Sequence, residues 1–246
     1  MIDLHSHILP AMDDGSESTA MTVEMARIAA KAGTRHIVCT PHCGASDPKL
    51  SDRIDEICRT TGRMNALLAD CGIPITLYPG MELFCRDTLL DVLERGQFLT
   101  LAGSRYLLIE FNFDAPPSLM EDAAELVADF RLCPVIAHPE RYTAIQRDPR
   151  RIIDWLQYGT LIQVNKGSIL GRFGRRASAA ADWILGNGLA HVVASDAHRS
   201  TVRTPDLSDA YETVAHRYSH HYAEILFRKN PNRILNDRDI VRPDEF

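Results

Sequence analysis

Short apolar segments rich in β-branched residues alternate along the chain with longer stretches in which apolar residues recur every three or four positions. The first pattern predicts buried strands, and the second predicts amphipathic helices. Seven strands are expected, at Ile2–Leu4, His36–Thr40, Pro74–Tyr78, Tyr106–Ile109, Pro134–Ala137, Leu161–Val164 and His191–Ala194. The clearest helices are expected at Ala20–Ala32, Ser51–Ala69, Met120–Phe130 and Arg175–Leu185. Strand–helix alternation of this kind is typical of parallel β/α architecture.

The composition is that of a globular chain without internal division. Its 246 residues suit one α/β barrel or two small domains, and because no Pro/Gly/Ser-rich linker interrupts them we expect a single domain over residues 1–246. No apolar run approaches the roughly 20 residues that span a bilayer, so no membrane insertion is expected. The six cysteines form no CxxC pair, which favours reduced thiols and a cytoplasmic location.

Charge and cysteine spacing argue against two classes of function. The net charge of −6, with Lys and Arg dispersed, argues against a general nucleic-acid binder. A phosphatase with a cysteine nucleophile needs a Cys-x5-Arg loop. The residues six positions after each cysteine are Ala45, Lys49, Met64, Leu77, Asp91 and Pro139. None is arginine, so the sequence excludes that mechanism.

Histidines and carboxylates stand at or just past the ends of six predicted strands. His5 and His7 are spaced i, i+2, which places both on one side of an extended chain. The full set of candidate metal ligands is His5, His7, Asp14, His42, Glu82, Glu110, His138, Asp196 and His198. The carboxyl ends of parallel barrel strands converge on one face, so these side chains are expected to meet there. Spacing does not separate Asp13 from Asp14, and Asp14 is preferred.

Five imidazoles and four carboxylates are too many for one ion and suit two or three divalent ions. The donor set, which lacks a thiolate, is compatible with Mn²⁺, Fe²⁺ or Zn²⁺. Such a cluster attracts a phosphate dianion and lowers the pKa of bound water, which favours hydrolysis of a phosphate ester. Arg141, three residues after His138, and Arg203, in the loop after His198, could hold the phosphate. Both could instead be surface arginines, and Glu110 could be a buried charge paired with Arg105 or Arg141.

Several of these motifs together resemble a known family. They are His5-Ser6-His7 with Asp13-Asp14-Gly15, Thr40-Pro41-His42, Pro79-Gly80-Met81-Glu82, Leu107-Leu108-Ile109-Glu110-Phe111, His138-Pro139-Glu140-Arg141-Tyr142 and Ser195-Asp196-Ala197-His198. From residue 1 to about residue 235 the chain is similar to the bacterial PHP-type (polymerase and histidinol phosphatase) protein-tyrosine phosphatases of the CpsB/CapC/YwqE type. One departure is Cys43, which stands where many members carry a second histidine.

The resemblance implies a distorted (β/α)7 TIM-like barrel of the PHP fold, with up to three metal ions, manganese being expected and iron or zinc the alternatives. It also implies dephosphorylation of phosphotyrosine on a bacterial tyrosine autokinase that controls capsule or exopolysaccharide synthesis, with Arg141 and Arg203 serving the phosphate. Alternatives are a small-molecule phosphatase of the histidinol-phosphate kind, a PHP nuclease, which the negative charge disfavours, or a regulator that binds the kinase without turnover. The sequence does not define the oligomeric state.

Overall fold

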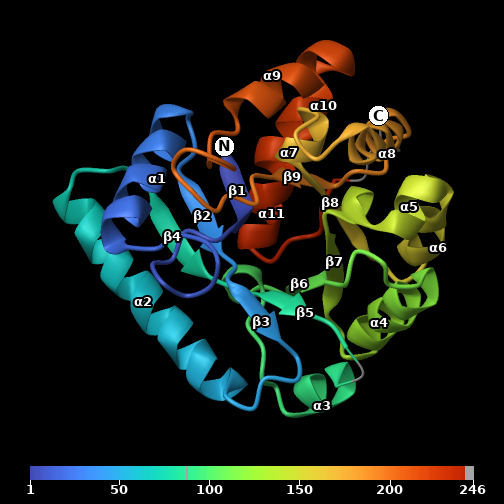
Figure 1. The fold of residues 1–246 in the computed structure, drawn as a ribbon, viewed down its shortest axis with the longest axis horizontal. Coiled ribbons are helices and arrows are strands. Elements are labelled where there is room, and N and C mark those ends of the chain that lie inside the picture. The colour runs from blue at the N-terminus through green and yellow to red at the C-terminus, as the bar shows by residue number, and fades with distance from the viewer. Residues whose placement is uncertain (87, 242–246) are drawn as a thin grey trace.

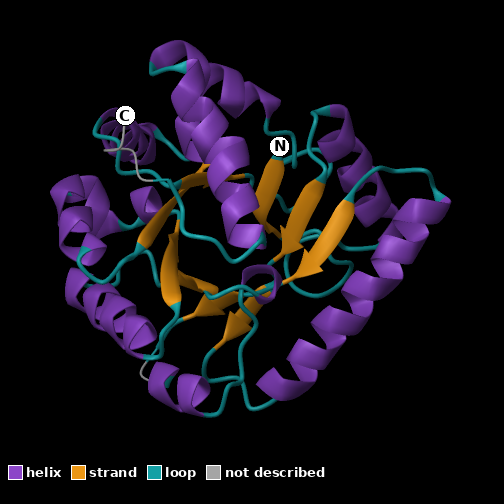
Figure 2. Ribbon diagram, turned by 180° about the vertical axis from the view of Figure 1, so that it is seen from behind, coloured by secondary structure: helices purple, strands orange, loops and turns teal. Residues whose placement is uncertain are grey.

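Parallel strands occupy the centre of the molecule, and helices cover their outer side (Figure 1). Figure 2 shows the same ring of strands inside a layer of helices from behind. The computed structural model describes residues 1–86 and 88–241. The strands are β1 (Ile2–Ser6), β2 (His36–Cys39), β3 (His42–Gly44), β4 (Thr76–Pro79), β5 (Glu82–Phe84), β6 (Tyr106–Glu110), β7 (Cys133–Ala137), β8 (Leu161–Asn165) and β9 (Val192–Ala194).

The helices follow the strands along the chain. They are α1 (Thr19–Lys31), α2 (Leu50–Asp70), α3 (Leu89–Glu94), α4 (Pro117–Asp129), α5 (Thr143–Arg147), α6 (Ile152–Leu156), α7 (Lys166–Ile169), α8 (Arg175–Gly186), α9 (Ser208–Arg217), α10 (His220–Glu224) and α11 (Asn230–Leu235). The buried residues of α1 are Thr22, Met25, Ala26 and Ala29, the i, i+3, i+4, i+7 spacing of a helix with one face on the core. All seven predicted strands and all four predicted helices are present, with bounds shifted by at most three residues.

The strands pair in parallel in two sheets, and at two places the chain runs directly from a strand of one sheet into a strand of the other. One sheet has the order β1-β2-β4, and the other has the order β3-β5-β6-β7-β8-β9. Strand β3 continues β2 after Thr40-Pro41, and β5 continues β4 after Gly80-Met81. The ring closes where Ser6 bridges to Ala197. If β2 with β3 and β4 with β5 are each counted as one strand, the described residues form a barrel of seven strands. This is the number expected for a distorted (β/α)7 barrel.

The two short strands β3 and β5 are absent from the sequence prediction because Pro41 and Gly80 are typical of strand ends. Gly80 lies so close to β2 that a Cβ atom there would come within 2.7 Å of Val38 Cγ1. The lack of a side chain therefore lets the backbone pass β2 and resume pairing. As a result His42 and Glu82 become register partners at the start of β3 and β5.

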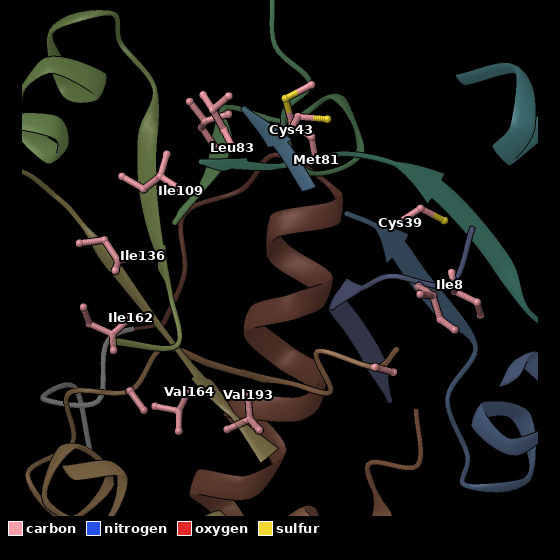
Figure 3. Close-up of a cluster of buried hydrophobic side chains, with 14 of the residues drawn as sticks. Ile8, Cys39, Cys43, Met81, Leu83, Ile109, Ile136, Ile162, Val164 and Val193 are labelled. Carbon is pink, nitrogen blue, oxygen red and sulfur yellow. The ribbon is translucent and has the colours of Figure 1, made fainter. Parts of the chain in front are cut away.

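The strands are buried on both faces. Ile109, Ile136 and Ile162 are register partners in β6, β7 and β8 and belong to the larger apolar cluster, part of which Figure 3 shows. The residues that precede them in each strand belong to a second cluster. This explains why the strands appear in the sequence as continuous apolar runs. No helix in the described part of the chain is long and apolar enough to cross a membrane.

Candidate metal centre

The predicted ligands lie at one end of the barrel, where the carboxyl ends of the strands meet. His5 belongs to β1, Glu110 ends β6, and His138 follows β7 directly. A cavity of about 480 Å³ opens at this end. Its lining includes Asp14, His42, Glu110, His138, Asp196 and His198, together with Arg141 and Arg203.

All nine predicted ligands fall into four overlapping groups, in each of which the donor atoms lie within 4.8 Å of one another. The groups are His7/Asp14/His42/His198, His5/His7/Asp196, His5/Glu82/His138 and His42/Glu82/Glu110. Four residues, His5, His7, His42 and Glu82, each belong to two groups. Shared ligands of this kind are what two or three neighbouring ions require, rather than separate sites.

The contacts between these donors fit bound cations. His5 Nε2 lies 3.1 Å from His7 Nε2, and two imidazole lone pairs can face each other at that distance only across a proton or a metal ion. Glu82 Oε2 is buried 3.2 Å from His5 Nε2 and 3.0 Å from His42 Nδ1, yet it makes no hydrogen bond of good geometry. A buried carboxylate oxygen without a donor is costly, and a divalent ion held by Glu82 would remove that cost.

The electrostatics of the centre also favour cations. Burial by itself raises the pKa of the Glu82 and Asp196 carboxyl groups, but the neighbouring cationic groups, His5 foremost, together more than offset it, and both pKa values lie well below the usual range. Burial likewise lowers the pKa of His7, while the carboxylates of Asp13, Asp196 and Glu82 together raise it well above the usual value. The buried carboxylates thus stay ionised and require positive charge nearby, which divalent ions would supply in place of imidazole protons.

The structure distinguishes the two adjacent aspartates. Asp13 lies behind His7, where its Oδ2 accepts from His7 Nδ1 at 2.6 Å and from the His42 backbone N–H at 2.9 Å. The Asp14 carboxylate is largely exposed and faces His42 Nε2 at 3.6 Å and His198 Nε2 at 3.4 Å. This arrangement supports Asp14 as the ligand and gives Asp13 the task of fixing the His7 tautomer.

The two oxygens of Asp196 face different groups. Oδ1 lies 3.6 Å from His5 Nε2 and 3.4 Å from His7 Nε2. Oδ2 instead contacts Arg203 at 2.5 Å and Arg141 at 3.3 Å. One buried carboxylate therefore connects the imidazole cluster with the two arginines that were predicted to hold phosphate.

Both arginines belong to the cavity wall. The Arg141 and Arg203 side chains are 18% and 27% exposed, so neither is the free surface arginine that the sequence left open. Arg105, the other proposed partner of Glu110, lies elsewhere and pairs with Asp237 and Asp239. The described contacts thus leave the guanidinium groups of Arg141 and Arg203 directed at the site.

Three candidate residues have strained backbones. The φ angles of His138, Asp196 and Arg203 are 34°, 49° and 51°, in the left-handed region that side chains disfavour. Each such residue costs on the order of 1–3 kcal/mol and persists only where the surrounding structure holds it. The left-handed turns directly after β7 and near the end of β9 direct His138 and Asp196 into the centre.

Three residues at and just after the end of β8 support the candidate ligands and arginines, and the sequence did not predict them. Gln163 Oε1 lies 2.9 Å from His5 Nδ1, and Asn165 Nδ2 donates to Asp196 Oδ2 at 2.5 Å. Lys166 is buried and donates to the backbone oxygen of Asp206, which holds the loop that carries Arg203. The available signal was a pair of polar residues, Gln163 and Asn165, at alternate positions of an otherwise apolar strand, which places both side chains on one face.

The cysteines allow a test of the prediction that no cysteine acts as the nucleophile. Burial raises the pKa of Cys43 to about 12 and raises the pKa of Cys39 and Cys85 as well, so these thiols are poor nucleophiles. Cys58 and Cys71 are exposed. Alkylation of the native protein should therefore label Cys58 and Cys71 and leave turnover within about twofold of its starting value, whereas a chelator should abolish turnover.

The control for this test is a Cys58→Ser/Cys71→Ser variant, which should retain activity and lose the rapid labelling. Mass spectrometry locates the labelled thiols. Stoichiometric inactivation by the thiol reagent with metals retained would instead indicate a covalent cysteine mechanism.

A parallel β/α barrel with a shared cluster of imidazole and carboxylate donors at the carboxyl ends of its strands belongs to the class of barrel metallohydrolases. The chain is a member of the CpsB/CapC family of capsular polysaccharide synthesis, whose model matches residues 1–236. The predicted family is thereby confirmed.

Named relatives cover nearly the whole chain. It is 33% identical over 245 residues to the tyrosine-protein phosphatase YwqE of Bacillus subtilis (strain 168), covering 98% of this chain and 94% of that protein. It is 29% identical over 243 residues to the tyrosine-protein phosphatase CpsB of Streptococcus pneumoniae, covering 97% and 99%. A crystal structure from the set of YwqE from Bacillus subtilis and CpsB from Streptococcus pneumoniae, described as unique metal-dependent tyrosine phosphatases, superposes with a TM-score of 0.90 at 32% identity, covering 98% of this chain and 97% of that one.

Proposed function

We propose that this chain is a metal-dependent protein-tyrosine phosphatase. The observation that carries the proposal is one cluster of nine N/O donors, six of which line the cavity together with two arginines. A phosphate dianion needs both kinds of partner, cations to offset its charge and guanidinium groups to orient its oxygens. The relatives named as tyrosine-protein phosphatases support the same activity for this chain.

Each set of residues has its own part in this reaction. Divalent ions held by the nine donors would lower the pKa of coordinated water and so supply hydroxide near neutral pH. Arg141 and Arg203 both contact Asp196 Oδ2, and guanidinium groups bind phosphate oxygens in the same way as carboxylate oxygens. Gln163 and Asp13 hold the His5 and His7 rings in one tautomer. The buried thiols take no part.

For the native metal we propose Mn²⁺, with Fe²⁺ or Zn²⁺ as alternatives. Carboxylate oxygens and imidazole nitrogens without a thiolate support all three, and the number of donors supports two or three ions. Cys43 lines the cavity beside His42, but its thiol is not part of the donor groups that the described residues form.

For the substrate we propose a phosphotyrosine segment of a bacterial tyrosine autokinase that acts in capsule or exopolysaccharide synthesis, which places the reaction in the cytoplasm. The family of capsular polysaccharide synthesis supports this partner. The cavity lining supports an aryl ester, because it includes the aromatic residues Phe84 and Phe113 beside the charged groups. A small phosphomonoester such as histidinol phosphate and a role in kinase binding without turnover are the alternatives.

One assay panel separates these possibilities. Metal-stripped protein is reconstituted with Mn²⁺, Fe²⁺ or Zn²⁺ and tested on a phosphotyrosine peptide, the matching phosphoserine peptide and histidinol phosphate. We expect Mn²⁺ to restore the most activity and the phosphotyrosine peptide to turn over at least about tenfold faster than the other two. Faster turnover of histidinol phosphate would overturn the protein substrate, and absence of all turnover with metals bound would favour the kinase-binding role.

A further inference from the structure

Two phenylalanine rings flank the guanidinium group of Arg141. The Arg141 Cζ atom lies 4.5 Å from the ring centroid of Phe113 and 4.5 Å from that of Phe173. Rings at this distance attract the cation through their negative faces and restrict its orientation. Arg203 Cζ also lies near Phe173, at 5.7 Å. The position of both arginines is therefore tied to aromatic side chains.

The two rings differ in their surroundings. The Phe113 side chain lines the cavity and is 45% exposed, whereas Phe173 is only partly exposed and lies against Gly167. A Cβ atom at Gly167 would come within 2.5 Å of Phe173 Cε2, so the missing side chain at residue 167 makes the space that the Phe173 ring occupies. Phe173 is thus a packed support, while Phe113 keeps ring surface open to the cavity.

Phe113 is held by contacts of both its backbone and its ring despite its exposure. Its backbone oxygen accepts from the Thr143 N–H at 2.7 Å, which ties the segment after β6 to the start of α5. Its ring lies 6.2 Å from the rings of both His138 and Tyr142. A large apolar side chain held at the wall of a polar cavity and left half open to it is suited to an apolar part of the ligand.

We propose that Phe113 is a specificity-determining residue that stacks on the aromatic ring of phosphotyrosine, and that Phe173 is a positioning residue for Arg141 and Arg203. The proposal rests on the proposed phosphatase function. Arg141 stacks on Phe113. When Arg141 binds the phosphate group, the ester oxygen and the tyrosine ring attached to it therefore lie next to the Phe113 ring. A phosphoserine side chain has no ring, so it gains no stacking energy from Phe113. Phe113 therefore makes the cavity selective for aryl over alkyl phosphate esters.

Inorganic phosphate makes this proposal testable, because it uses the arginines and the metals but has no ring. In the metal-loaded protein, Phe113→Leu should raise KM for a phosphotyrosine peptide by about three- to tenfold, the range of one aromatic pair. It should leave the inhibition constant of inorganic phosphate within about twofold, because Phe173 and Asp196 still hold Arg141 in place. Phe113→Tyr, which keeps a ring, should restore most of the affinity for the peptide. Phe173→Leu should weaken peptide and inorganic phosphate alike.

Phe130→Leu is the matched control, because Phe130 is also partly exposed, at 37%, but follows α4 away from the cavity lining. Equal weakening of peptide and inorganic phosphate in Phe113→Leu would mean that Phe113 only orients Arg141, and no change in either would mean that it does not touch the substrate. Both results overturn the proposal. Failure of the phosphatase function is recognisable separately, since the wild-type protein would then bind inorganic phosphate without hydrolysing the peptide, and the inference would fall with it.

Discussion

Replacing Asp196 by Asn should reduce kcat/KM for a phosphotyrosine peptide by at least about 10³-fold and release at least one equivalent of metal. The substitution removes the charge that faces His5 and His7 through Oδ1 and weakens the acceptor of Arg141 and Arg203 at Oδ2. Asparagine tolerates the left-handed backbone at this position, so the loss reports on the charge rather than on strain. Elemental analysis and steady-state kinetics measure the two effects.

Asp237 supplies a matched control for that experiment. Its φ angle of 51° is nearly that of Asp196, but it binds the Arg105 backbone N–H at the opposite end of β6 from the cavity. Asp237→Asn should therefore keep its full metal content and turnover. If Asp196→Asn kept both as well, the donor cluster described for this site would be wrong.

Arg141→Ala should keep its metals and its fold while kcat/KM for the same peptide falls by about 10²-fold. Losing one charged donor to the developing phosphoryl charge costs on the order of 3 kcal/mol. The metals should stay because Arg203 and Asn165 still hold Asp196 Oδ2. Arg141→Lys should recover only part of the activity, since an ammonium group can neither bind two phosphate oxygens side by side nor stack between two rings.

Arg147, exposed at the end of α5, is the control for the loss of a nearby positive charge. Arg147→Ala should behave like the wild type in kcat/KM and metal content. Wild-type kinetics in Arg141→Ala would show that Arg141 does not bind the phosphate. Arg203 would then be the remaining candidate, and the same comparison of Ala and Lys variants would apply to it.

Most of the barrel could be predicted from the sequence because its strands are buried on both faces and therefore appear as continuous apolar runs. The nine candidate ligands could be found for a related reason. Their positions next to strand ends, from His5 in β1 to Asp196 after β9, matter only if the strands are parallel, and the alternating helices indicate that they are. Pattern and topology together placed residues far apart in sequence at one end of the molecule.

What the sequence did not show depends on loop geometry and on contacts between distant segments. Asp13 and Asp14 are neighbours of one type, and only the folded loop shows which of them lies behind His7. Pro41 and Gly80 suggested strand ends, although close packing against Val38 lets pairing resume. Phe113 and Phe173 are 60 positions apart, and nothing in their local sequence indicates that they flank one guanidinium group.

The barrel closes at the same place where the candidate ligands meet. Ser6, which bridges to Ala197, stands between His5 and His7, and Ala197 stands between Asp196 and His198. The first and last candidate ligands are 193 positions apart, residues 5 and 198, so a growing chain has no complete site until most of it has been made. Contacts of such long range form slowly, because the loop between them must close first. Metal ions would therefore bind the closed ring in preference to partly folded chains, and their binding energy would be added to the stability of the closed ring.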